Sequence, residues 1–274
     1  MSSPEPKVDR LTTYPIKSLD GRSVDSVSLV ENGGLAGDRE FALFDAEGEY
    51  VNGKRERRVH RIRADYEGDG ARIDAVELST DDSEPHRFEA DELTDGGEAV
   101  DWLAERVGYP VSLARDPAGG FPDDTHASGP TVISTATIET VASWFDGIST
   151  DGMRRRLRAN IELGGVPAFW EDRLFVDRDQ HVEFTIGETA VRGVNPCQRC
   201  VVPSRDPDTG AEYEGFQPTF VEKRRETMPE WSGGNWFDHD FRLMVNTMVP
   251  QSEWGETISV GDVVEVGRTV PAEE

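Results

Sequence analysis

Apolar and polar residues alternate loosely through the first third of the chain, in short segments separated by glycines and polar turns. The clearest segments are DREFALF, GEYVNG and ARIDAVEL, at residues 38–44, 48–53 and 71–78. An alternation with a period of two is typical of β-strands. No segment between residues 8 and 80 carries a helical period, so we expect half of an all-β barrel or sandwich there.

Two later segments do carry the helical period. In GEAVDWLAERVG, apolar residues recur at i, i+3, i+4 and i+7 from Val100, which predicts an amphipathic helix. In TATIETVASWF, the apolar residues from Ile138 to Phe145 share one face. Ser134 or Thr135 is placed to cap this second helix.

Residues 114–130, ARDPAGGFPDDTHASGP, are polar and rich in glycine and proline, which predicts a linker or a mobile loop. Beyond them, further strands are expected in the segments TVIST, ANIEL, DRLFV, HVEFTIG, FRLMVNTMV and GDVVEVG. We therefore predict a mostly β (α+β) fold with a few peripheral helices, in one large domain or two smaller ones.

Acidic residues outnumber basic ones by 54 to 29, which gives a formal net charge of −25. Lysine occurs only at Lys7, Lys17, Lys54 and Lys223, and acidic excess with so little lysine is typical of salt-in halophiles, the haloarchaea among them. Such a surface makes nucleic acid and anionic membranes poor partners. The start of the chain lacks a signal region and no apolar run approaches 18 residues, so we expect a cytoplasmic protein.

The chain has two cysteines, Cys197 and Cys200, in the stretch NPCQRC. A structural zinc site needs four ligands, and the five histidines stand singly along the chain. A redox dithiol normally opens a helix, which Pro196 and the following prolines disfavour. Two interpretations remain open: one functional thiolate, favoured by the cationic neighbour Arg199, or two small buried hydrophobic residues.

Basic residues gather in two short stretches. KRERRVHR, at residues 54–61, and RRRLR, at residues 154–158, together contain nine of the 29. Arginine suits phosphate and carboxylate groups, so these stretches indicate either an anion site or internal pairing with the many carboxylates. Further along, DPDTG has the composition of a tight turn, with Asp206 able to start it and Gly210 free to take a positive φ.

Five motifs occur in the order found in MOSC proteins: YPIKSLDG, GGLAGDREFALFD, RLRANIEL, PCQRCVVPSRDPDTG and TISVGDVVEV. The chain therefore resembles this family, named after the domain shared with the C-terminus of molybdenum cofactor sulfurase. It is similar to the two-domain members, such as the mitochondrial amidoxime-reducing component and its bacterial relatives. The resemblance implies an N-terminal MOSC β-barrel domain over residues 6–115 and a β-barrel MOSC domain over residues 116–270.

The family binds the molybdenum cofactor (Mo-molybdopterin), a pterin dithiolene with a phosphate, and one protein cysteine ligates the metal. The resemblance implies that Cys200 is this ligand and the catalytic residue, since a thiolate suits a soft metal, and that Cys197 is a bystander. Ten other residues match the family's cofactor contacts: Lys17, Ser18, Arg39, Ser134, Thr135, Arg158, Asn160, Ile161, Gln198 and Arg199. Arg57, Arg58, Arg154 and Arg155 match none, so we expect them to be paired on the surface.

By the same resemblance, we expect an oxidoreductase that removes oxygen from a small N-hydroxylated or related substrate. Electrons would come from an external donor such as a ferredoxin or a flavoprotein reductase, because the chain carries no four-cysteine iron–sulfur segment. Pyridoxal phosphate is not expected, because the desulfurase domain of cofactor sulfurase is missing. Two other functions remain open: a carrier of the cofactor or of sulfur on Cys200, and a non-catalytic anion-binding module that depends on Lys17 and Arg39.

Overall fold

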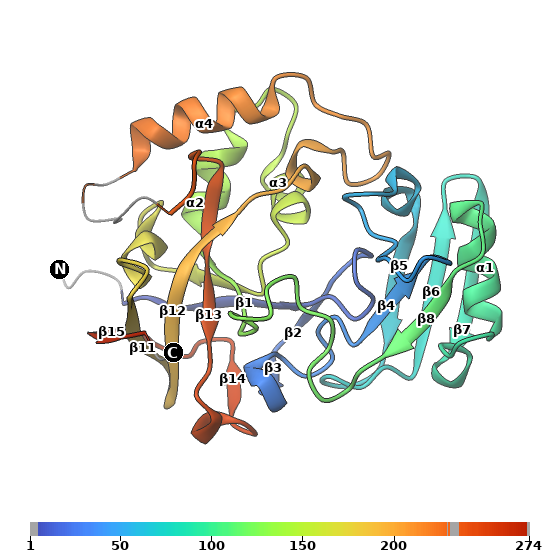
Figure 1. Ribbon diagram of the computed structural model, residues 1–274, viewed down its shortest axis with the longest axis horizontal. Helices are drawn as coiled ribbons and strands as arrows, with labels where there is room; N and C mark the ends of the chain where they lie inside the picture. The colour runs from blue at the N-terminus through green and yellow to red at the C-terminus, as the bar shows by residue number, and fades with distance from the viewer. Residues whose placement is uncertain (1–4, 229, 231–235, 273–274) are drawn as a thin grey trace.

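An eight-stranded sheet forms the centre of the computed structural model, which describes residues 5–228, 230 and 236–272 (Figure 1). The strand order is β15-β11-β12-β13-β9-β10-β1-β2, with β9 and β10 parallel and the other neighbours antiparallel. The strands are β1 (Lys7–Thr13), β2 (Arg22–Val24), β9 (Val132–Ser134), β10 (Ile161–Gly164), β11 (Gln180–Ile186), β12 (Thr189–Gln198), β13 (Arg242–Met248) and β15 (Val264–Pro271).

Strand β13 lies between two hydrophobic cores. Leu243 and Met244 pack with one core and Val245 with the other, because the positive φ of Met244, at 71°, interrupts the regular alternation of side chains. All but the last of its residues are buried, as expected of a strand that is covered on both faces. The covering helices on one side are α2 (Thr135–Ala142), α3 (Thr150–Leu157) and α4 (Phe216–Thr227).

Three smaller sheets complete the described strands. They pair β3 (Ser26–Ser28) with β14 (Thr257–Ser259), β4 (Phe41–Phe44) with β8 (Ser112–Arg115), and β6 (Ala75–Thr80) with both β5 (Arg63–Glu67) and β7 (Ser83–Glu89). Helix α1 (Glu98–Val107) packs onto the last two of these sheets through a third hydrophobic core. Figure 1 shows this assembly at one end of the long axis, away from α2 and α4.

The mostly β fold and both expected helices, now α1 and α2, are confirmed. Ser134 caps α2 by accepting a hydrogen bond from the backbone of Thr137, at 3.1 Å. The strand prediction for DRLFV was wrong, because residues Trp170–Leu174 form a 3₁₀ helix. GEYVNG was also wrong: it forms no strand, and only Tyr50 makes an isolated bridge, to Phe44.

Helices α3 and α4 were not predicted. In α4 the buried positions are Phe216, Phe220 and Arg224, so a charged residue occupies the last position of the apolar stripe and hides the helical period. In α3 the buried residues include Arg156. A buried arginine reads as a polar residue in sequence patterns, although its long side chain can fill a core position when it is paired.

The proposed division at residues 115 and 116 remains a prediction. Strand β1 pairs with β10, and β3 pairs with β14, so the first 28 residues of the chain contribute strands to sheets built from its second half. This interleaving brings the YPIKSLDG motif, which follows β1, into contact with the second half of the chain.

Candidate cofactor site

A cavity of about 1280 Å³ opens between the two halves of the chain. Its lining includes eleven lysine and arginine residues against seven carboxylates, a net charge of about +4 in a chain whose net charge is −25. The volume exceeds what a typical small-molecule site needs. The scarce basic residues of this protein are thus concentrated around one large space that suits an anionic ligand.

Lys17, from the YPIKSLDG motif, is one of these cavity cations and is only 6% exposed. Its Nζ donates to the carbonyl of Phe121 at 2.8 Å and to the carboxylate of Asp123 at 2.5 Å. The Nε of Arg39 lies 3.8 Å from the same carboxylate. Desolvation would raise the pKa of Asp123, but Arg39 and Lys17 outweigh it and hold that pKa at about 2.

Arg158 has no such partner. It ends α3 in the left-handed conformation, and its guanidinium carbon lies 4.1 Å from the centre of the Tyr14 ring. Within the described residues, its side chain makes no hydrogen bond or ion pair. Burial lowers the pKa of Arg158, because removal from water destabilises its charge and the carboxylates of Asp20 and Asp123, which are not in ion-pair contact with it, offset this only in part. An anion bound in the cavity would supply the missing counter-charge.

Unusual backbone conformations cluster at this cavity. Six non-glycine residues in the described ranges have a positive φ, and four of them line the cavity: Ser18, Arg39, Arg158 and Met244. Each such residue costs free energy and persists only where the surrounding structure imposes it. Three of the four are residues that the sequence motifs single out as cofactor contacts.

The two cysteines occupy different environments. Cys200 follows the end of β12, is half-buried and lines the cavity, and its Sγ has no hydrogen-bond partner in the described chain. The side chain of Arg199 turns to Cys197 instead, with Nη1 3.2 Å from that sulfur, and its Nη2 donates to the carbonyl of Leu157 at 3.0 Å. The interpretation of Cys200 as a thiolate favoured by its neighbour Arg199 therefore stays a prediction. Burial raises the pKa of Cys197, and Arg199 offsets this only in part.

Arg205 is a further arginine in the cavity lining. Its residue exposure is 9%, and its Nη1 donates to the carbonyl of Gly53 across the cavity. Arg205 directly precedes the DPDTG turn. That turn forms as expected, with Gly210 at a φ of 69° and its amide bonded to the carbonyl of Asp206 at 2.9 Å.

The remaining matched residues divide into two groups. Asn160 lines the cavity, and its side chain joins the carbonyl of Thr12 at 3.1 Å to Thr131 at 3.1–3.2 Å. Gln198 also lines it, with Nε2 3.0 Å from a ring nitrogen of His239. Three matched residues do not line it: Ser134, Thr135 and Ile161. Ser134 and Ile161 are fully buried, the first as the helix cap and the second in the core, so the structure does not bring these three to the cavity.

The four arginines without an expected role also divide. Arg57 pairs with Glu212, and Arg58 with Glu56, at 3.1 and 2.8 Å on the surface, as expected. Arg154 and Arg155 are paired too, with Glu162 at 2.6 Å and Asp208 at 2.7 Å, but they line the cavity. Their placement on the outer surface was therefore wrong, although the pairing was correct.

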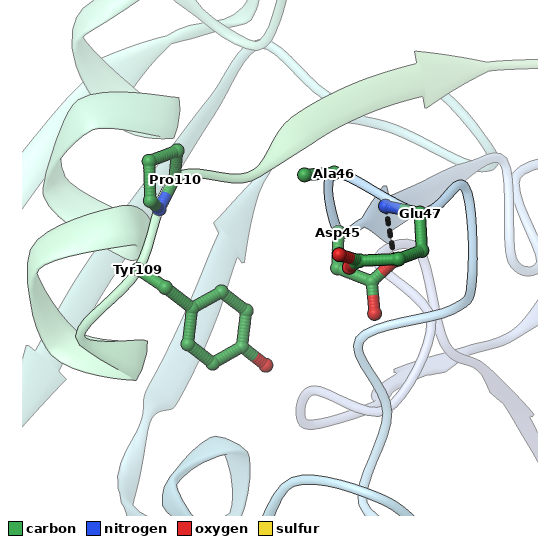
Figure 2. A pocket seen from close by; sticks show the side chains of 5 residues that line it. All are labelled: Asp45, Ala46, Glu47, Tyr109 and Pro110. Carbon is green, nitrogen blue, oxygen red and sulfur yellow. Dashed lines mark hydrogen bonds between the residues drawn. The ribbon is translucent and has the colours of Figure 1, made fainter.

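A second, smaller hollow of about 370 Å³ lies between the turn at residues 45–47 and the end of α1 (Figure 2). Its lining residues are Asp45, Ala46, Glu47, Tyr109 and Pro110. The carboxylate of Asp45 accepts a hydrogen bond from the backbone of Glu47 at 3.1 Å and so stabilises its own turn. This lining contains two carboxylates and no basic side chain, in contrast to the large cavity.

Comparison with known families agrees with the motifs. A model of the MOSC N-terminal β-barrel domain matches residues 5–110, and a model of the MOSC domain matches residues 123–265, more than half of the chain. The chain belongs to the MOSC family. No curated protein gave a significant match. The crystal structure of the YuaD protein from Bacillus subtilis is similar to this MOSC chain at 11% sequence identity and a TM-score of 0.37. The alignment covers 98% of this chain and 97% of the YuaD chain.

MOSC domains bind the molybdenum cofactor, and the residues of this cavity fit such a group. Cys200 offers a soft ligand, and Arg158 lacks a counter-charge. Elsewhere in the lining, four arginines have a buried Nε atom with no hydrogen-bond partner in the described chain, namely Arg63, Arg156, Arg199 and Arg205. The described residues contain no group of three His, Cys, Asp or Glu side chains placed around a metal.

Sequence reasoning on this MOSC chain missed three cavity residues: Tyr14, Asp123 and Arg205. Tyr14 and Arg205 stand inside the quoted motifs, so attention to every residue of a motif could have found them. Asp123 gave no signal in the sequence, because it lies in a polar loop and is one of 54 acidic residues in the chain.

The described part of the chain contains no helix long and apolar enough to cross a bilayer.

Proposed function

We propose that this MOSC protein is a molybdenum-cofactor oxidoreductase that removes oxygen from N-hydroxylated or related small molecules. One observation carries the proposal: Cys200 shares a single cavity of about 1280 Å³ with Lys17, Arg39 and Arg158. A soft metal ligand and a group of cations thus face the same space, as a ligand with a metal at one end and a phosphate at the other requires.

The residues would divide the work as follows. Cys200 holds the metal as a thiolate, while the three cations hold the phosphate. Cys197 remains a protonated thiol, because burial raises its pKa. When bound, the cofactor supplies two-electron oxygen-atom chemistry, in which an N–OH group, two electrons and two protons give N–H and water. The electrons come from a partner protein of the ferredoxin or flavoprotein class.

Metal analysis tests the proposal directly. The wild-type chain and the variants Cys200→Ser and Cys197→Ser are purified from a host that makes the cofactor. We expect molybdenum and pterin in the wild type and in Cys197→Ser, and at least about a tenfold loss in Cys200→Ser, because the Cys197 sulfur is already in contact with Arg199 whereas that of Cys200 has no partner in the described chain. The Cys197 variant is the matched control, since it alters the same loop.

Turnover is measured with an aromatic amidoxime and a reduced viologen dye as the electron source. Wild-type protein that contains no molybdenum, or equal metal content in the two cysteine variants, contradicts the proposal. The unpartnered Sγ of Cys200 also suits a sulfur carrier. A persulfide on Cys200, found by mass spectrometry in protein without molybdenum or turnover, supports that second function instead.

A further inference from the structure

The polar loop at residues 114–130 crosses the cavity and is tied down on both sides of its tip. Before the tip, the amide of Phe121 bonds to the carbonyl of Arg39 at 2.9 Å, and Asn32 Nδ2 donates to the carbonyl of Gly119 at 2.8 Å. After the tip, Ser128 Oγ donates to the carbonyl of Asn32 at 2.5 Å. The segment between these anchors, residues 122–127, contributes five residues to the cavity lining.

The tip itself has one polar link to the rest of the molecule. No backbone hydrogen bond joins residues 122–127 to any other described residue. Asp124 bonds only to the backbone of His126, at 2.9 Å within the tip. The remaining link is the carboxylate of Asp123, which reaches Lys17 at 2.5 Å and Arg39 at 3.8 Å. Asp123 thus holds the tip over the cavity.

This carboxylate lies where the cavity presents its buried cations. The side chains of Lys17 and Arg39 are 7% and 12% exposed, whereas that of Asp123 is 74% exposed. The cations are fixed in the protein wall, and the carboxylate of Asp123 reaches them from the solvent side, on a loop tip with no other polar link to the described residues. Arg39 also pairs with the carboxylate of Asp38, whose side chain is 11% exposed. An anion arriving from solvent would therefore compete with Asp123 chiefly for Lys17 and secondarily for Arg39.

We propose that Asp123 is an internal competitor for the anionic group of the ligand and sets the selectivity of this site. A ligand with a singly charged carboxylate would only replace the negative charge of Asp123 with another, so its binding would be weakly favourable. A phosphate dianion brings a second charge and more acceptor oxygens, so it displaces Asp123. Displacement releases the 122–127 tip. The inference rests on the proposed function only for the identity of the ligand that carries the phosphate.

Calorimetric titration with inorganic phosphate, at one fixed sodium chloride concentration, tests the competition without the cofactor. We expect Asp123→Asn to bind phosphate about three- to tenfold more tightly than the wild type, because the competitor has lost its charge. Asp81→Asn, which removes an exposed carboxylate between β6 and β7 and outside the cavity lining, is the control for net charge and should bind as the wild type does. Asp123→Glu keeps the charge and should also behave as the wild type, which separates competition from damage to the loop.

Acetate tests the selectivity. It should bind the wild type far more weakly than phosphate does, and Asp123→Asn should reduce that difference. Phosphate binding that is unchanged or weakened in Asp123→Asn, or absent from both proteins, overturns the inference. Failure of the molybdenum analysis overturns the proposed function alone, since the phosphate titration involves neither metal nor pterin.

Nitrogen-15 relaxation of the backbone amides tests the release of the tip. In the wild type, phosphate should lower the order parameters of residues 123–127, whereas in Asp123→Asn they should already be low without it. The order parameters of α1, which lies outside the cavity, serve as the internal reference. Higher order parameters of the tip on phosphate addition in the wild type contradict displacement.

Discussion

Two groups of buried basic residues in this protein are paired with aspartates in different ways. In the core, Arg224 Nη2 donates to both carboxylate oxygens of Asp172, at 2.6 and 2.5 Å, and the two side chains are 1% and 2% exposed. At the cavity, Lys17 and Arg39 share Asp123, whose side chain is 74% exposed.

The difference is access to an outside anion. In the core, Arg224 and Asp172 are out of reach of solvent, so no outside ion can replace either partner. The cavity group has a replaceable partner in Asp123 and an unpaired cation in Arg158. A buried ion pair serves structure when it is sealed, and an excess of buried cations around an open space serves binding. Removing charges from each group should therefore affect different properties.

The largest effect is expected in the sealed group. Arg224→Met leaves the Asp172 carboxylate buried without its partner, which should lower the free energy of unfolding by about 3–5 kcal/mol. Denaturant unfolding measures this loss. Arg225→Met is the matched control. Arg225 lies on the same helix as Arg224, but its side chain is 63% exposed and pairs with Asp240, so its replacement should change stability little. Equal losses in the two variants would refute the distinction between sealed and exposed pairs.

Glu171, next to Asp172, should make stability depend on pH. Burial, aided by the charge of Asp172, raises the pKa of Glu171 to about 7 from an ordinary 4.5. The unfolded chain loses this proton above about pH 4.5 while the folded protein keeps it, so this group's contribution to stability falls as pH rises from about 4.5 to 7.

Glu171→Gln removes that penalty and can still accept the hydrogen bond from Thr137, at 3.1 Å in the wild type. We expect the variant to be more stable than the wild type by about 2 kcal/mol at pH 8, with little difference at pH 5. Denaturant unfolding across this range gives the comparison. A difference that does not change with pH argues against the raised pKa.

At the cavity, Arg158→Met should weaken binding without weakening the fold. We expect about a tenfold loss in phosphate affinity, or about 1.4 kcal/mol, because the variant removes a cation that faces the ligand. Stability should change by less than about 1 kcal/mol, because no carboxylate loses a partner. Arg57→Met on the surface is the control for net charge. A large loss of stability in Arg158→Met, or unchanged affinity, would erase the contrast with Arg224.

The smallest effect is expected at Asp208, in the turn behind Cys200. Its carboxylate pairs with Arg63 at 2.6 Å and with Arg155 at 2.7 Å, and its side chain is 49% exposed. Asp208→Asn should lower the free energy of unfolding by about 0.5 kcal/mol at low salt and by less at high salt, since exposed pairs are screened. Unfolding at two sodium chloride concentrations checks this. A loss above about 2 kcal/mol would place this pair with the sealed group.

Local patterns predicted the elements whose buried faces are purely apolar. The regular stripe in GEAVDWLAERVG gave α1, and the alternation in DREFALF contains β4. Prediction failed where a polar side chain occupies a core position, as Arg224 does in α4. It failed again in DRLFV, whose apolar residues lie in and beside a 3₁₀ helix. Period counting cannot recognise an arginine that is buried because a distant carboxylate pairs with it.

The sequence by itself determined the family and the mostly β fold, and it predicted the residues for the chemistry, because these depend on ordered motifs and on local residue types. Only the tertiary structure decided which of those residues share a space. It placed Cys200 with Lys17, Arg39 and Arg158, and left Ser134 in the core as a helix cap. It also brought Asp123 to cations more than 80 positions away along the chain. Such pairings depend on how the strands of the two halves interleave, and no local pattern encodes that.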